Sequence, residues 1–192
     1  MSGLLFACAA GEEEKAPNII FILADDMGYG DVSALNENSK IQTPHIDKIA
    51  RQGVVFTDAH SSSSVSTPTR YGILTGRYNW RSTLKRGVLG GYSLPLIPRE
   101  RRTIASILKE QNYETACIGK WHLGWAWNNI EKGNEQVDFS KPITHGPLDL
   151  GFGYFYGVSA SLDFPPEVYV EKNMRHEVPD RFTGDTGVQA CW

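Results

Sequence analysis

Residues 18–24 read NIIFILA, an uninterrupted apolar run between Pro17 and a pair of aspartates. The run is too short for a typical helix, and continuous apolar character over this length is typical of a strand buried on both faces, as in a parallel sheet. Residues 54–59 (VVFTDA) and residues 113–119 (YETACIG) have the composition of two further strands. The sequence therefore predicts a sheet built from these three segments.

The segments between these strands carry helical signals. Residues 43–53 begin with Thr-Pro, which suits an N-cap and a first helical position, and they end with glycine. Residues 103–111 predict a second capped helix, with Ile104, Ile107 and Leu108 facing inward. After about residue 125, glycine, proline and aromatic residues predict ordered loops instead. Strand, helix, strand, helix and strand in succession predict an α/β fold with a mostly parallel sheet flanked by helices.

Composition agrees with a folded globular domain. The chain has 192 residues, of which 41% are apolar and 21% are charged, and its net charge is -3. This apolar content excludes a disordered acidic tail, and the near-neutral charge argues against a nucleic-acid partner. No segment approaches the ~20 apolar residues of a membrane span, so no integral membrane segment is expected. Three cysteines cannot make a disulfide framework, and Cys117 is predicted to be a small buried apolar residue.

Residues 1–16 are predicted to be a truncated signal peptide or a lipoprotein-type N-terminus. Residues 4–11 (LLFACAAG) place small residues around a cysteine just before a polar stretch. The apolar part is shorter than the roughly 7–15 residues of a complete signal peptide, and no basic residue precedes it. A start codon placed too late would account for this, and the alternative is an apolar N-terminus with no targeting role. Export would make the protein periplasmic, secreted or lipid-anchored at the bacterial cell surface.

Two adjacent carboxylates, Asp25 and Asp26, directly follow the first predicted strand. In open α/β sheets, ligands gather beyond the carboxyl ends of the strands. Adjacent carboxylates repel one another unless a cation lies near them, and Ca²⁺ and Mg²⁺ prefer oxygen ligands. The pair is therefore a candidate metal site. The alternative is that one aspartate caps a turn through Gly28 and Gly30 while the other is solvated.

Ser66 lies just before a third candidate helix, which follows the second predicted strand. Thr67 is a possible N-cap, and Gly76 ends the helix. The backbone N–H groups and the dipole of such a helix favour an anion near Ser66, and Arg70 lies about one turn further along. This arrangement suits a hydroxyl nucleophile that faces a bound oxyanion. The alternative is a Ser/Thr-rich loop that enters a capped helix.

A cation and an imidazole, Lys120 and His122, follow the third predicted strand. In an extended segment the two side chains point to the same side, because side chains alternate. A single pair of this kind is usually an ordinary surface feature. Three strands would nevertheless bring an acidic pair, a hydroxyl with an arginine, and this pair to the same edge of one sheet, which favours a catalytic site.

These motifs together resemble the N-terminal part of a type I sulfatase of the alkaline-phosphatase-like superfamily. Residues 17–31 (PNIIFILADDMGYGD) resemble the first strand and metal-binding pair of that family. Residues 66–77 (STPTRYGILTGR) and residues 119–124 (GKWHLG) match its two signatures. Residues 151–166 resemble the segment that ends in a substrate-facing serine and aspartate. The resemblance extends over about residues 17–170, so residues 17–192 are expected to be the N-terminal portion of a catalytic domain.

The resemblance implies a metal ion and a modified residue. Asp25 and Asp26 would bind Ca²⁺, with Mg²⁺ possible, and Ser66 would be a third metal ligand. A maturation enzyme of the formylglycine-generating type that accepts serine would oxidise Ser66 to formylglycine, which indicates a bacterial source. The hydrate of formylglycine has two hydroxyls on one carbon, of which one attacks sulfur and the other later expels sulfate.

The resemblance also implies roles for the other candidate residues. Arg70 and Lys120 would hold the hydrate and the sulfate charge. His122 would hydrogen-bond the hydrate and act as the base that assists sulfate release. Ser161 and Asp163 would face the substrate. The implied activity is sulfuric ester hydrolysis on a sulfated carbohydrate or an aryl sulfate.

The same residues also fit other interpretations. Unmodified Ser66 would suit a phosphatase or phosphodiesterase relative, and a non-catalytic truncated remnant would at best bind anions. The other calcium and leaving-group residues of the family are expected downstream of Trp192, so the 192-residue chain is expected to be an incomplete domain with little activity. Basic residues between 77 and 102 either steer a sulfated polysaccharide or form a solvated surface. Trp121, Trp125 and Trp127 either stack on sugars or belong to the core.

Overall fold

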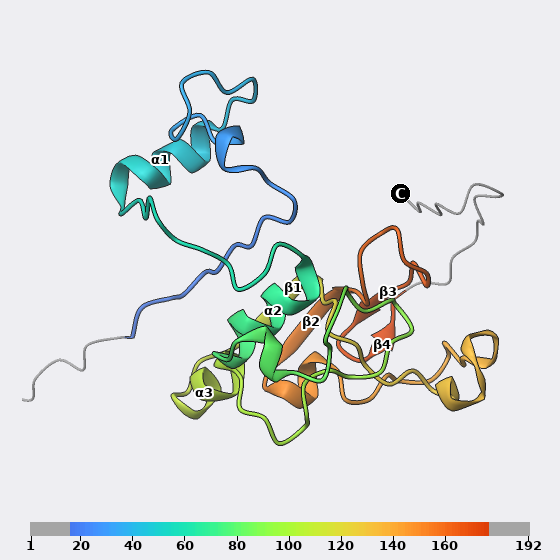
Figure 1. The fold of residues 1–192 in the computed structure, drawn as a ribbon. Helices are drawn as coiled ribbons and strands as arrows, with labels where there is room; N and C mark the ends of the chain where they lie inside the picture. The colour runs from blue at the N-terminus through green and yellow to red at the C-terminus, as the bar shows by residue number, and fades with distance from the viewer. Residues whose placement is uncertain (1–15, 177–192) are drawn as a thin grey trace, which may run out of the picture. The chain divides into compact units, whose positions relative to one another are not determined.

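The computed structural model describes residues 16–176, which fall into two compact units divided between Val55 and Phe56. Figure 1 shows the helices and strands along the chain. These are α1 (Pro44–Gln52), α2 (Ser66–Thr75), α3 (Ile104–Glu110), β1 (Ala116–Lys120), β2 (Tyr154–Val158), β3 (Tyr169–Glu171) and β4 (Met174–Arg175). Short 3₁₀ helices are η1 (Tyr29–Asp31), η2 (Asn79–Arg81), η3 (Ile130–Lys132), η4 (Asn134–Gln136) and η5 (Pro147–Leu150). The predicted signal peptide or lipoprotein terminus falls on residues that lie, except for Ala16, outside the described range.

Helix α1 confirms the helix predicted over residues 43–53, and one aspartate ties it to the preceding loop. The carboxylate of Asp47 accepts hydrogen bonds from Ser33 Oγ at 2.7 Å, Thr43 Oγ1 at 2.8 Å and the backbone N–H of Ala34 at 3.0 Å. Thr43 precedes the helix as predicted, but its hydroxyl bonds this carboxylate and makes no cap bond to the backbone. The network therefore fixes the loop on the first turn of α1.

The strands predicted over residues 18–24 and 54–59 do not form. Residues 19–23 have no regular structure, and their side chains are 39–84% exposed. An apolar run indicates a tendency to be buried, but a strand also needs the N–H and C=O groups of a neighbouring strand. All the strands of the described residues lie between Ala116 and Arg175, so neither segment has such a partner within them.

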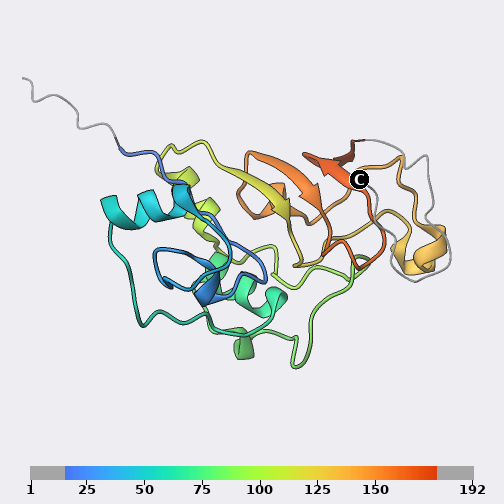
Figure 2. The ribbon, with the colours of Figure 1, turned by 90° about the horizontal axis from the view of Figure 1, so that it is seen from above.

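The sheet has four strands in the order β1-β2-β3-β4. Strands β1 and β2 are parallel, with Ala116 opposite Tyr154 and Lys120 opposite Val158. The β2–β3 and β3–β4 pairs are antiparallel, so within the described residues the sheet is mixed, not mostly parallel (Figure 2). Strand β2 lies in a segment predicted as loops, because its glycines and aromatic residues interrupt any clear alternation of apolar and polar positions.

The core of the second unit is aromatic. Trp121, Trp125, Trp127 and Phe155 are at most 3% exposed, and their rings meet edge to face. The three tryptophans are therefore core residues, and they are not available for stacking on sugars.

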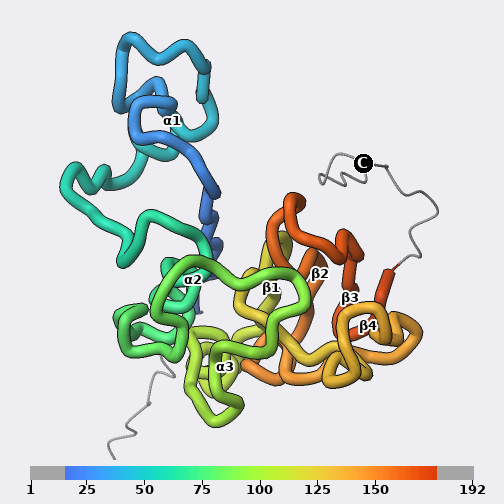
Figure 3. Tube along the Cα trace, turned by 45° about the vertical axis from the view of Figure 1, so that its right-hand side comes forward, coloured from blue at the N-terminus to red at the C-terminus, as the bar shows by residue number. Residues whose placement is uncertain are grey.

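Helices α2 and α3 lie on the β1 side of the sheet (Figure 3).

Helix α3 begins as predicted but buries a different face. The hydroxyl of Thr103 accepts a hydrogen bond from the backbone N–H of Ser106 at 3.2 Å, which caps the helix. Ala105 is 1% exposed, whereas Ile104 and Ile107 are 47% and 45% exposed. The prediction that these two isoleucines face inward is therefore wrong.

No helix within residues 16–176 has the length and apolar character needed to cross a membrane.

Candidate active site

Ser66 is the first residue of α2. Val65, in an extended conformation, occupies the N-cap position, so the prediction that Thr67 caps this helix is wrong. Gly76 ends α2 as predicted, in the left-handed conformation with φ 63°. Ser66 is half-buried, and its hydroxyl lies at the N-terminal end of the helix, where the backbone dipole favours negative charge.

The chain beyond β1 continues beside the end of β2. The backbone N–H groups of Trp121 and His122 donate to the carbonyl oxygens of Val158 at 3.0 Å and Ser159 at 2.9 Å. His122 has φ 58°, in the left-handed region, so the segment is not extended as far as this residue. The alternation that was expected to put Lys120 and His122 on one side therefore does not apply.

Ser66 and His122 form the central contact of the site. Ser66 Oγ lies 3.0 Å from His122 Nδ1, and the other ring nitrogen, Nε2, lies 2.5 Å from the carbonyl oxygen of Leu89. A carbonyl oxygen can only accept, so Nε2 carries the proton. In the neutral ring Nδ1 is then an acceptor, and the Ser66 hydroxyl donates to it. The site thus pairs a hydroxyl with a nitrogen base that is itself only 1% exposed.

Arg70 links α2 to the end of β1. Its Nη1 donates to the carbonyl oxygen of Lys120 at 2.6 Å, and Arg70 itself lies about one helical turn beyond Ser66 in α2. Burial raises the pKa of the Cys117 thiol to about 11, and the positive charge of Arg70 partly offsets this rise. Cys117 packs against the core but is only partly buried, so it is less buried than predicted.

The turn after β2 reaches the site through an aromatic ring. The Phe164 ring centroid lies 5.7 Å from that of His122, and the Phe164 N–H donates to the carbonyl oxygen of Ser161 at 3.0 Å. Ser161 is half-buried and Asp163 is exposed. The predicted substrate-facing pair thus belongs to a turn that contacts His122 through Phe164.

Three participants were not identified from the sequence. The carbonyl of Leu89 leaves no side-chain signal, and Thr67 was interpreted as a cap. The sequence places Phe164 in a segment predicted as loops, although an aromatic residue directly after Asp163 is a usable signal.

Asp25 and Asp26 lie in the first unit, whereas Ser66 lies in the second. Both aspartates are exposed, and Asp26 has φ 60°. Their carboxylates are the donors that Ca²⁺ and Mg²⁺ prefer. Among residues 16–176, however, no group of three or more histidine, cysteine, aspartate or glutamate side chains could hold a metal ion. The predicted ligand set is therefore chemically suitable, but it is not assembled within either unit.

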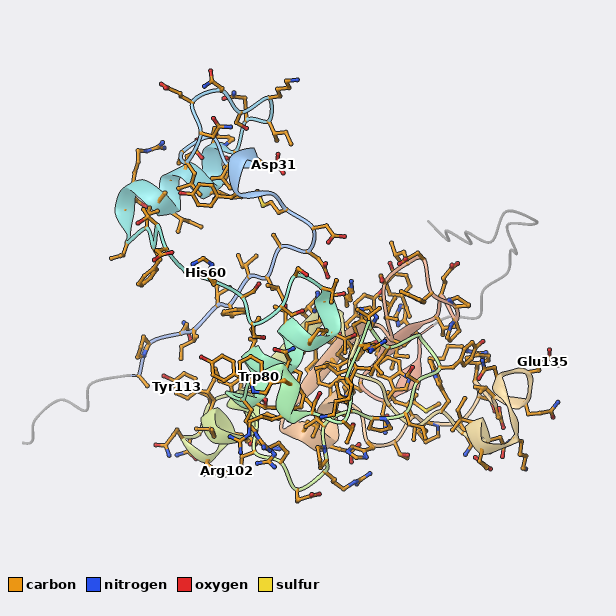
Figure 4. The ribbon with its side chains drawn as sticks, viewed as in Figure 1. Asp31, His60, Trp80, Arg102, Tyr113 and Glu135 are labelled. Atoms are coloured by element: carbon orange, nitrogen blue, oxygen red, sulfur yellow. The ribbon has the colours of Figure 1, made fainter. Side chains whose placement is uncertain are left out.

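The basic residues between 77 and 102 are partly neutralised. Arg99 Nη1 donates to Asp149 Oδ1 at 3.0 Å, and Arg102 forms an ion pair with Glu110. Figure 4 labels Arg102 within this surface. Both arginine side chains are largely exposed, so these contacts agree with the interpretation of a solvated surface.

Comparisons with known proteins give one consistent result. Residues 17–185 match the family model described as Sulfatase. The chain is 40% identical over 189 residues to N-acetylgalactosamine-6-O-sulfatase of Bacteroides thetaiotaomicron, covering 91% of this chain and 35% of that protein. It is 41% identical over 163 residues to steryl-sulfatase of Homo sapiens, covering 81% of this chain and 26% of that protein.

A solved structure agrees with these matches. It belongs to a 6S-sulfatase from work on the metabolism of multiple glycosaminoglycans by Bacteroides thetaiotaomicron. The TM-score is 0.75 at 39% identity, and the match covers 88% of this chain and 35% of that one. The chain thus spans about a third, or less, of the length of the relatives that it matches.

Proposed function

Because the chain belongs to the sulfatase family, we propose that it acts in sulfuric ester hydrolysis, with residue 66 as the nucleophile. The observation that supports this most strongly is the 3.0 Å contact between Ser66 Oγ and His122 Nδ1. The family is generally dependent on formylglycine and a metal ion. We infer that a serine-type formylglycine-generating enzyme oxidises Ser66 before the protein acts.

The residues around position 66 suit this chemistry. As its hydrate, a formylglycine there would supply one hydroxyl that attacks sulfur and displaces the alcohol of the ester, and a second hydroxyl whose loss of a proton expels sulfate and restores the aldehyde. His122 Nδ1 is an acceptor at the contact with residue 66, so it can take the proton of that second hydroxyl and assist sulfate release. Arg70 and Lys120 would hold the negative charge of the sulfate group, as fixed cations do in a site where charge develops.

The metal ion would be held by oxygen atoms of Asp25, Asp26 and residue 66. Support comes from donor chemistry, since carboxylates suit Ca²⁺ better than nitrogen or sulfur ligands would, and Mg²⁺ is the alternative. Such a cation would supply positive charge close to the sulfate oxygens. We further propose that additional ligands lie outside the 192 residues, and that this chain by itself turns over sulfate esters slowly.

The proposed substrate is a sulfated carbohydrate or an aryl sulfate, contacted by Ser161 and Asp163. The names of the similar proteins support this class, because they include an N-acetylgalactosamine-6-O-sulfatase and a protein from work on glycosaminoglycan metabolism. Because residues 4–11 resemble the end of a signal peptide or a lipoprotein cleavage site, we propose that the protein is periplasmic, secreted or lipid-anchored.

One alternative keeps the same contact. An unmodified serine whose hydroxyl donates to an imidazole is itself an activated nucleophile, which would suit a phosphatase or phosphodiesterase. A non-catalytic remnant that at best binds anions is the other alternative.

A paired assay distinguishes these readings. The chain, produced together with a serine-type formylglycine-generating enzyme, is given an aryl sulfate and the matching aryl phosphate, beside Ser66→Ala. We expect slow sulfate release that disappears in Ser66→Ala, and a rate well below that of a complete sulfatase. Phosphate release that exceeds sulfate release would support the phosphatase, and no release of either product would support the remnant.

A further inference from the structure

Thr67 is a buried hydroxyl with no role in the reaction just proposed. It is the second residue of α2, and its side chain is 0% exposed. Because Val65 occupies the N-cap position, the hydroxyl is not needed to cap the helix. A hydroxyl this deeply buried is costly unless it has good hydrogen-bond partners, so its partners indicate what it does.

Those partners form a closed triangle. Thr67 Oγ1 donates to the carbonyl oxygen of His122 at 2.9 Å and accepts from the backbone N–H of Leu89 at 3.2 Å. His122 Nε2 in turn donates to the carbonyl oxygen of Leu89 at 2.5 Å. One hydroxyl therefore holds both the backbone of His122 and the residue whose carbonyl receives the ring proton.

The triangle matters because His122 can exist as two neutral tautomers. With the proton on Nε2, the other nitrogen accepts from the group at position 66 and can serve as a base. With the proton on Nδ1, the same contact would present a donor to Ser66, and no base would be there. The Leu89 carbonyl selects the first tautomer, and its position depends on the bond between its own N–H and Thr67.

We propose that Thr67 is a positioning residue that holds His122 in the tautomer with the proton on Nε2. The role of that tautomer in catalysis rests on the proposed function, but the tautomer itself does not. Loss of the hydroxyl leaves the Leu89 N–H and the His122 carbonyl without this shared partner, so the Leu89 carbonyl loses its fixed place. The conservative variant Thr67→Ser keeps the hydroxyl and should keep the tautomer.

The experiment is nitrogen-15 NMR of the imidazole of His122 in the full 192-residue chain with Ser66 unmodified, at one alkaline pH. Thr67→Val and Thr67→Ser are compared with Thr75→Val. The control removes a hydroxyl from the same helix, one that bonds only locally, to the Tyr71 carbonyl at 2.6 Å and the Arg77 N–H. Because the measurement needs neither formylglycine nor turnover, its result is independent of whether the protein is a sulfatase.

We expect wild type, Thr67→Ser and Thr75→Val to show the Nε2-protonated tautomer, and Thr67→Val to show a mixture or the opposite tautomer. The Leu89 amide should exchange slowly with solvent in the first three chains and at least tenfold faster in Thr67→Val. An unchanged tautomer in a folded Thr67→Val would overturn the proposal. If Thr67→Val does not fold, wild type and Thr67→Ser decide: an Nδ1-protonated ring or an unprotected Leu89 amide in either one would overturn it.

Discussion

Ser66 Oγ lies 3.0 Å from His122 Nδ1, although the two residues are 56 positions apart in the chain. The contact joins the first residue of α2 to the segment that follows β1, so it exists only when the helix and the parallel β1–β2 pair are correctly packed. It is also the contact through which a base could activate the group at position 66. The packing of α2 with the β1–β2 pair and the proposed activation of the group at position 66 therefore involve the same two side chains.

Replacement of the Ser66 hydroxyl should cost little stability. Ser66→Ala removes the hydroxyl that hydrogen-bonds Nδ1 of His122, and we expect the free energy of unfolding to fall by about 1 kcal/mol. The exposed Ser64 provides the matched control, since Ser64→Ala should change it by less than about 0.5 kcal/mol. Urea unfolding followed by tryptophan fluorescence measures both, and equal values for the two variants would show that the contact is not formed in solution.

The parallel strand pair should not tolerate a methyl group at position 157. A Cβ added to Gly157 would collide with the backbone carbonyl oxygen of Gly119, directly opposite on β1. Gly157→Ala must push the strands apart, and we expect a loss of about 3 kcal/mol in the free energy of unfolding.

Gly90→Ala serves as the control for this variant. A Cβ at Gly90 would meet its nearest neighbour, Ser93 Oγ, at 3.9 Å, which is an ordinary contact. We expect it to cost less than about 1 kcal/mol. A Gly157→Ala chain as stable as Gly90→Ala in chemical denaturation would mean that β1 and β2 do not pair in this register.

The thiol of Cys117 should react slowly in the folded chain. Burial raises the pKa of this thiol to about 11, so only about one thousandth of it is ionised at pH 8. We expect iodoacetamide to alkylate the peptide that contains Cys117 at least about 100-fold more slowly in native protein than in urea. Peptide mass spectrometry over time gives both rates, and native alkylation as fast as in urea would contradict the raised pKa of this thiol and its packing against the core.

The loop before α1 should loosen at low pH. Hydrogen bonds from Ser33 first, and then from Thr43 and Ala34, hold the pKa of Asp47 below its ordinary value. A lowered pKa means that the stabilising bonds are fully present above the ordinary value and are lost as the pH falls through the lowered one. The backbone N–H of Ala34 should therefore report the change.

NMR measures this transition directly. The chemical shift of the Ala34 amide should titrate with a midpoint below that of an unperturbed aspartate, and the Asp47→Asn chain should show no such transition. A midpoint at or above the ordinary value would show that the carboxylate does not accept these bonds.

The sequence predicted the elements that depend on local signals. Thr-Pro and glycine bounded α1, Thr103 capped α3, and the run that contains Cys117 became β1. The resemblance to a sulfatase is confirmed, as is the alkaline-phosphatase-like α/β fold class. Ser66 does lie beside His122, but the strand over residues 54–59 that was expected to bring Ser66 to the sheet edge does not form.

The features that the sequence did not predict depend on contacts between residues that are far apart in the chain. Residues 18–24 are apolar enough for a strand, but pairing is a property of the neighbour as well as of the run. The glycines within β2 and beside it hid its alternation of apolar and polar positions. The Leu89 carbonyl is a backbone group, so the identity of residue 89 gives no sign of its role.

The mass of the peptide that contains residue 66 tests the proposed conversion of Ser66 to formylglycine. The protein is isolated from cells whose serine-type formylglycine-generating enzyme converts a known sulfatase in parallel. We predict a peptide lighter than the serine form by two hydrogen atoms that also reacts with a hydrazide probe for aldehydes. An unmodified Ser66 peptide, found together with full conversion of the parallel sulfatase, would contradict the proposal that Ser66 is converted to formylglycine.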